Sequence, residues 1–123
     1  MRVALKAAGP ERIMLVTDAM PSTGADTQDF ELQGRHIHYA NGALRGPDGQ
    51  LAGSALDMAS AVRNAADMLG VGLEAACRMA AEVPARFLGL PHGRLEIGAP
   101  ADFVALSDDG ALQAVIQSGQ LQS

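Results

Sequence analysis

The chain is poor in aromatic residues and has no tryptophan. Its 123 residues include three phenylalanines and one tyrosine, and the net charge of −5 comes from dispersed acids. Proteins that bind single-stranded nucleic acid stack bases on aromatic side chains above basic grooves. The composition therefore predicts no nucleic-acid partner, and the acidity argues against binding to an anionic membrane.

Cysteine and long apolar runs are also scarce. The single cysteine, Cys77, cannot form a disulfide within the chain, which favours a reducing, cytoplasmic setting. No apolar run reaches the roughly 20 residues of a membrane span, and residues 1–6 lack the apolar core of a signal peptide. We therefore expect a cytoplasmic protein with no membrane partner and a length that fits one domain.

The most informative stretch is residues 12–20. Residues 13–17 are apolar or β-branched and carry no charge, which predicts a strand buried on both faces. Asp18 follows at its carboxyl end, the side on which parallel α/β folds bind ligands. From position alone, Asp18 is either a capping or loop-bonding residue, the more common role of Asp in turns, or a catalytic acid.

The rest of the first half predicts a helix and a hairpin. Residues 3–8 are typical of a helix stopped by a Gly-Pro pair, and residues 30–39 alternate around a turn. Asn41-Gly42 and residues 47–49 predict two further turns. Such a long insertion after a strand often helps to build a site.

The second half predicts helices and then strands. Ser54 is the expected N-cap of an amphipathic helix that ends at Gly70, and residues 73–82 and 85–88 predict two more helices. Met58, Met68 and Met79 are interpreted as core filler. From residue 93 the pattern predicts β-strands over residues 101–106 and 112–116, with a last turn at 118–119. We expect a domain boundary near Leu90.

Two features have both a structural and a functional interpretation. His36 and His38 share one face of the predicted hairpin and could ligate one metal. No nearby cysteine completes the set, so we interpret them as solvated surface residues; His92 has no identifiable partner. Gly53, just before a helix start, exposes backbone N–H groups that can bind a polar ligand, although any helix starting at Ser54 would look similar.

Several blocks together resemble one known family. The sequence resembles the N-acetylglucosamine-6-phosphate deacetylases of the amidohydrolase superfamily in residues 13–20, Gly24, residues 51–54, 61–64, 79–80, 84–85 and 98–102. The resemblance covers the whole chain but only the C-terminal third of such an enzyme. It implies an α/β fold: residues 1–90 as the C-terminal end of a metal-dependent (β/α)8 barrel, and residues 91–123 as strands of a small β-sandwich domain.

The resemblance also implies residue roles. Asp18 would be the catalytic acid/base at the end of the last barrel strand, and Leu51, Ala52 and Gly53 would contact the substrate. The substrate would be an amino-sugar phosphate, N-acetylglucosamine 6-phosphate, which is deacetylated to glucosamine 6-phosphate and acetate. The cofactor would be a divalent metal, with zinc expected. The family's metal ligands, a Glu and two His, lie upstream of the matched region and are absent from this chain.

Two alternatives stay open at this point. The chain could belong to another amidohydrolase that acts on a different N-acyl amine, or it could be a non-catalytic remnant that serves as an assembly module. Because the family's metal ligands are absent, we expect the isolated chain to be inactive. We also expect a homo-oligomer, such as a dimer, because surfaces built to pack against a barrel would otherwise be exposed.

Overall fold

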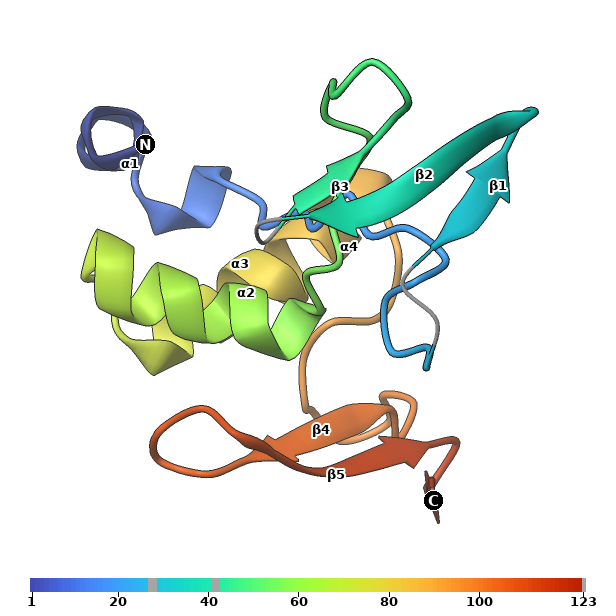
Figure 1. Cartoon of the computed structure of the whole chain (residues 1–123). Helices are drawn as coiled ribbons and strands as arrows, with labels where there is room; N and C mark the ends of the chain where they lie inside the picture. The colour runs from blue at the N-terminus through green and yellow to red at the C-terminus, as the bar shows by residue number, and fades with distance from the viewer. Residues whose placement is uncertain (27–28, 41–42, 123) are drawn as a thin grey trace. The chain divides into compact units, whose positions relative to one another are not determined.

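The computed structural model describes residues 1–26, 29–40 and 43–122. The chain forms two compact units, one made of Met1–Val16 with Ala59–Ser123 and the other of Thr17–Met58. Figure 1 shows the path of the chain through its helices and strands. This division differs from the boundary near Leu90, which stays a prediction.

The smaller unit, Thr17–Met58, is built on an antiparallel sheet in the order β1 (Phe30–Leu32), β2 (Arg35–Ala40) and β3 (Ala43–Arg45) (Figure 1). The β1–β2 turn has φ of 50° at Gln33 and 75° at Gly34, which confirms the predicted hairpin. Ile37 and Leu44 are buried. The Asn41-Gly42 turn lies outside the described residues, whereas the turn at residues 47–49 is confirmed.

The larger unit contains four helices, and glycine residues mark several of their ends. They are α1 (Arg2–Ala8), α2 (Met58–Asn64), α3 (Leu73–Ala80) and α4 (Glu82–Leu88). Pro10–Arg12 forms a 3-10 turn, and α2 continues as a π-helical turn over Ala65–Leu69. Gly70 and Gly89 end their helices in the left-handed conformation, which glycine adopts without a steric penalty.

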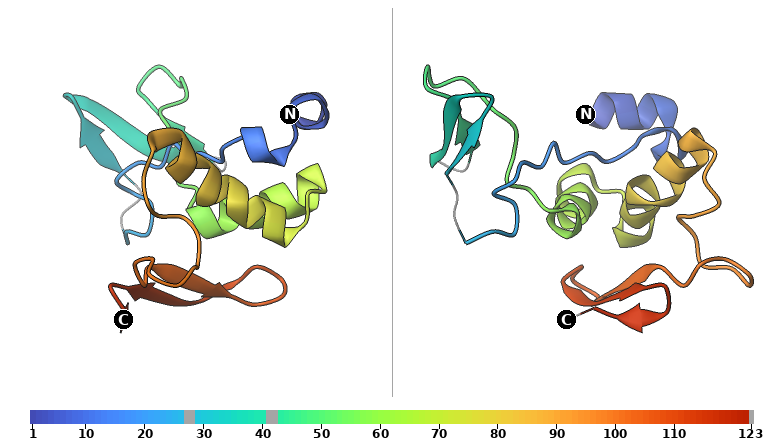
Figure 2. Two further views of the ribbon diagram at one scale, coloured as in Figure 1. Left: turned by 180° about the vertical axis from the view of Figure 1, so that it is seen from behind. Right: turned by 90° about the vertical axis from the view of Figure 1, so that its right-hand side faces the viewer.

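The helices pack around a small apolar core. Val62, Ala65 and Ala76 are its buried centre, and Leu15 and Leu106 pack against it from other segments. Both views of Figure 2 show α2 beside α3, as these contacts require. Met79 is fully buried as predicted, but Met58 and Met68 are 39% and 64% exposed. The core-filler interpretation was therefore wrong for these two.

The predicted strand at residues 13–17 takes a different form. The segment is extended but joins no strand ladder. Ile13, Leu15 and Thr17 are half-buried, whereas Met14 and Val16 are exposed. The Leu15 amide donates to the carbonyl of Met79 at 2.9 Å. The expectation of burial on both faces was wrong, because the described residues provide a covering layer on one side only and no parallel strand beside it.

The start of α2 also differs from the prediction. The helix begins at Met58, so Ser54 is not its N-cap. The Ser54 hydroxyl instead donates to the carbonyl of Thr17 at 2.6 Å and accepts from the Leu56 amide at 3.0 Å. The hydroxyl oxygen therefore accepts from an amide that lies two residues before the helix, and its proton ties this segment to Thr17.

The C-terminal strands agree with the sequence pattern. β4 (Phe103–Leu106) pairs antiparallel with β5 (Leu112–Gln117), which pairs with β6 (Gln120–Leu121). Ser118 and Gly119 turn the chain with positive φ. In the described part of the chain, no helix has the length and apolar character needed to cross a membrane.

Candidate functional site

Asp18 has an unusual backbone conformation. Its φ is +53°, in the left-handed region, which is costly for most side chains and is tolerated best by Gly, Asn and Asp. The residue is exposed. Within the described residues, its carboxylate takes part in no hydrogen bond or ion pair. The carboxylate is therefore available to accept a proton or to contact a ligand.

The segment that contains Leu51, Ala52 and Gly53 links the sheet to the loop around Asp18. At one end, Leu51 forms an antiparallel bridge with Arg45, and the Ala52 amide donates to the Leu44 carbonyl at 3.0 Å. At the other end, Ser54 forms a parallel bridge with Ala19. Residues 51–54 thus join the buried core of this unit to the chain that presents Asp18.

Ser54 makes most of the contacts between the two segments. Its amide donates to the Asp18 carbonyl at 2.9 Å, and its own carbonyl accepts from the Met20 amide at 2.9 Å. The hydroxyl bond to Thr17 adds a third link, and the Thr23 hydroxyl lies 3.5 Å from the Ser54 carbonyl. These contacts bracket Asp18 on both sides.

Gly53 allows the two segments to approach. Its φ is +92°, and a Cβ built on it would lie 2.4 Å from Met20 Cγ and 3.2 Å from the Asp18 carbonyl oxygen. Such a contact with Cγ is too short for real atoms, so a side chain here would have to displace its neighbours. A glycine is required both by the backbone conformation and by the crowding.

The structure therefore brings together several residues predicted from the sequence. Gly53 lies against the Asp18 backbone and the Ala52 amide is hydrogen-bonded to β3, while Leu51 is 70% exposed. Their catalytic and substrate-binding roles stay predictions. Sequence reasoning missed the contribution of Ser54, because the pattern that predicts an N-cap does not distinguish it from a serine that bonds to a distant carbonyl.

One further polar group in this unit was not predicted. Ser22, in the loop after Asp18, is 6% exposed, and its hydroxyl has no hydrogen-bond partner among the described residues. Burying a hydroxyl without a partner is unfavourable. No pattern in the sequence marks this serine.

The histidines do not assemble a metal site. His36 lies 3.6 Å from the carboxylate of Asp29, and His38 lies opposite Arg45 in the β2–β3 ladder. The described residues contain no group of three or more His, Cys, Asp or Glu side chains placed to hold a metal ion. The residues of this chain therefore do not fit the expected divalent metal by themselves.

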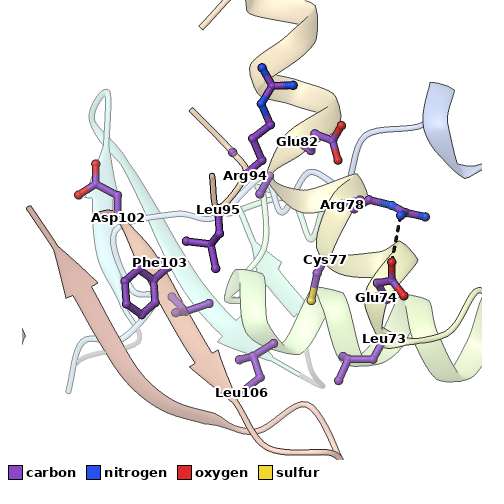
Figure 3. Close-up of a pocket in the computed structure, with 13 residues that line it drawn as sticks. Leu73, Glu74, Cys77, Arg78, Glu82, Arg94, Leu95, Asp102, Phe103 and Leu106 are labelled. Atoms are coloured by element: carbon purple, nitrogen blue, oxygen red, sulfur yellow. Dashed lines mark hydrogen bonds and ion pairs between the residues drawn. The ribbon is translucent and has the colours of Figure 1, made fainter. Parts of the chain in front are cut away.

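The larger unit contains a separate cavity of about 900 Å³ between α3 and β4. Figure 3 shows Phe103 and Leu106 of β4 on one side and Leu73 and Cys77 of α3 on the other. The Arg78 guanidinium at its edge is paired with Glu74 at 3.0 Å. Burial raises the pKa of the Cys77 thiol, which disfavours the reactive thiolate form. We interpret this cavity as a packing surface, because its lining is mainly apolar.

Known proteins match this chain along its whole length. The amidohydrolase family profile matches residues 4–121. The chain is 44% identical over 119 residues to an N-acetylgalactosamine-6-phosphate deacetylase of Shewanella sp. (strain ANA-3), covering 96% of this chain and 30% of that protein. It is 36% identical over 112 residues to an N-acetylglucosamine-6-phosphate deacetylase of Vibrio furnissii, covering 89% of this chain and 28% of that protein.

Solved structures match as well. The N-acetylglucosamine-6-phosphate deacetylase from Pasteurella multocida superposes with a TM-score of 0.91 at 28% identity, over 99% of this chain and 32% of that one. A mutant of the Mycobacterium smegmatis enzyme, in complex with N-acetyl-D-glucosamine-6-phosphate, gives 0.88 at 36% identity, over 98% and 33%. The chain spans about a third of these proteins. Because the family profile covers residues 4–121, this chain belongs to the amidohydrolase family.

Proposed function

We propose that this chain is the C-terminal portion of an enzyme that removes the acetyl group from an N-acetylated amino-sugar 6-phosphate. N-acetylglucosamine 6-phosphate is the substrate that we expect, with Asp18 as the acid/base. The observation that carries the proposal is the exposed Asp18 carboxylate, which is presented on a constrained backbone beside residues 51–54. The names of the relatives support this class of substrate.

The proposed chemistry uses one carboxylate twice. Asp18 accepts a proton from water as the water oxygen bonds to the acetyl carbon, and it gives the proton to the amide nitrogen as the carbon–nitrogen bond breaks. The products are acetate and the free amine. A single group can do both only if it stays within hydrogen-bond reach of water and nitrogen, which requires a fixed backbone.

The described residues do not supply the ligands of the metal. The family is generally metal-dependent, and we expect a divalent ion, with zinc as the first candidate. Since the described residues form no metal-ligand group, its ligands would come from chain outside these 123 residues. When bound, such an ion would make the water a stronger nucleophile.

A chimera tests the role of Asp18. Residues 1–123 would replace the matching stretch of the Shewanella deacetylase, and hydrolysis of both hexosamine 6-phosphates would be measured. We expect Asp18→Asn to lower kcat by a factor of about 10² to 10⁴. Asp26→Asn is the matched control, because Asp26 is also exposed and lies in the loop after Asp18. Full turnover by the Asp18→Asn chimera would exclude the proposed role.

The same assay addresses the alternatives. If the chimera hydrolyses another N-acyl amine faster than either sugar phosphate, the other-amidohydrolase alternative is favoured. We expect the isolated 123-residue chain to show no turnover with added Zn²⁺. Turnover by that chain that is lost in Asp18→Asn would contradict this expectation.

The assembly-module alternative has an observation of its own. Val16 is 80% exposed and Phe87 74% exposed, and exposed apolar side chains promote association. We propose that the chain self-associates as a dimer or a larger oligomer. Light scattering over a concentration series tests this, and a strictly monomeric species would refute it.

A further inference from the structure

We infer that Ser54 is a positioning residue that sets the backbone conformation of Asp18 and so directs its carboxylate. The inference rests on the proposed function of Asp18. It assigns a role to a residue whose sequence context predicts only a helix cap.

The hydrogen bonds of Ser54 reach both peptide groups that flank Asp18. The Ser54 hydroxyl donates to the Thr17 carbonyl at 2.6 Å, and the Ser54 amide donates to the Asp18 carbonyl at 2.9 Å. The Thr17 carbonyl belongs to the peptide group before the Asp18 Cα, whose orientation defines φ. The Asp18 carbonyl belongs to the peptide group after it, whose orientation defines ψ. One residue therefore restrains both soft dihedrals of Asp18.

This restraint matters because the conformation is not one that Asp18 would adopt freely. Its φ of +53° lies in the left-handed region, which is sparsely populated by non-glycine residues and persists where the surroundings enforce it. If the hydroxyl bond is lost, the peptide group before Asp18 becomes free to rotate toward the more populated regions. The carboxylate would rotate with it.

The hydroxyl itself has a defined orientation. Its oxygen accepts from the Leu56 amide at 3.0 Å, so its own proton is left to point at the Thr17 carbonyl. The helix α2 starts at Met58, so this bond is a local turn rather than a helix cap. The link between residues 17 and 54 is thus built into the fold of this unit.

The first test is made on the chain itself by NMR, without reference to activity. In Ser54→Ala we expect the Asp18 Cα shift and HN–Hα coupling to leave their left-handed values. Amide exchange at Met20 should rise roughly 2- to 10-fold, which corresponds to the loss of one hydrogen bond. Ser54→Thr, which keeps a hydroxyl, should restore both. Ser107→Ala, which removes a hydroxyl that accepts from the Ala111 amide, should leave Asp18 unchanged.

Unchanged Asp18 parameters in Ser54→Ala would overturn the inference. The second test uses the chimera described above. We expect Ser54→Ala to lower kcat by a factor of about 10 to 100, the loss expected when a catalytic group moves by about 1 Å, with KM unchanged. Ser54→Thr should recover most of the rate. If Asp18→Asn is inactive but Ser54→Ala is fully active, the inference fails and the proposed function stands; if Asp18→Asn is active, the proposed function fails.

Discussion

Replacing Gly53 by alanine should destabilise the smaller unit more than the same change at any open glycine of that unit. The added Cβ would lie 2.4 Å from Met20 Cγ, 2.8 Å from Met20 Sδ and 3.2 Å from the Asp18 carbonyl oxygen. The methionine side chain can move aside at some cost, but the carbonyl is backbone and is hydrogen-bonded to Ser54. The alanine would therefore separate residues 53–54 from Asp18.

The magnitude follows from two contributions. A non-glycine residue at positive φ costs about 1–2 kcal/mol, and overpacking a filled site costs about 1–3 kcal/mol. Gly53→Ala, with both, should lower the free energy of unfolding by about 2–5 kcal/mol. Gly24→Ala is the matched control in the same unit, because Gly24 has φ +75° and no atom within 4 Å of its added Cβ. It should show the backbone cost alone.

Urea unfolding followed by tyrosine fluorescence measures this difference. Tyr39 is the single tyrosine, there is no tryptophan, and it lies in β2 of the same unit as Gly53. The signal therefore reports the unfolding of that unit even if the two units unfold separately. Equal losses of stability in Gly53→Ala and Gly24→Ala would refute the crowding argument, as would a failure of Met20→Ala to reduce the effect of Gly53→Ala.

Three other outcomes follow from the larger unit. Met79→Ala should lower the free energy of unfolding by about 2–5 kcal/mol, because it removes a fully buried side chain, whereas Met68→Ala should change it little. Urea unfolding followed by circular dichroism measures both variants. Equal losses of unfolding free energy in the two variants would refute this prediction. The pKa of Asp109 is lowered, first by a hydrogen bond from the Ser107 hydroxyl and then by one from a backbone amide. The ionised carboxylate therefore stabilises the fold at pH values above its unfolded-state pKa. This stabilisation is lost as the pH falls through the pKa of the folded state. Ser107→Ala should raise that pKa in a carboxyl NMR titration, and an unchanged value would contradict the stated cause. Because burial raises the pKa of Cys77, the thiol should react with DTNB at pH 8 more slowly than a cysteine peptide does. In urea, the two reaction rates should be the same. A peptide-like rate in the folded chain would refute this prediction.

The elements that the sequence predicted correctly depend on neighbouring residues. The β1–β2 hairpin follows from Gln33-Gly34, which adopt positive φ, and the helix ends at Gly70 and Gly89 follow from the same property of glycine. The strands of the C-terminal sheet follow from short, mainly apolar segments separated by turn residues. In each case, the residues that decide the structure lie within a few positions of the element itself.

The features that sequence missed depend on distant partners. Residues 13–17 are apolar enough for a strand covered on both faces, but the faces are covered only if other segments lie there, and Val16 is exposed. The start of α2 was predicted at Ser54 because a serine before an apolar periodic segment is the usual N-cap. Its hydroxyl instead bonds to Thr17, which is 37 residues away. The periodicity of apolar residues carries no information about such a distant pairing.

The candidate site combines both kinds of information. The family resemblance suggests that Asp18 and residues 51–54 lie close together. The hydrogen bonds that join them link residues far apart in the sequence. Gly53 provides the space for the approach, Ser54 provides the bonds, and Asp18 can occupy the left-handed region because aspartate tolerates it better than most side chains. Glycine at position 18 would fit the backbone as well, but it would bring no carboxylate. Aspartate at position 18 therefore keeps a carboxylate at this turn, at the cost of a backbone conformation that glycine would adopt more easily.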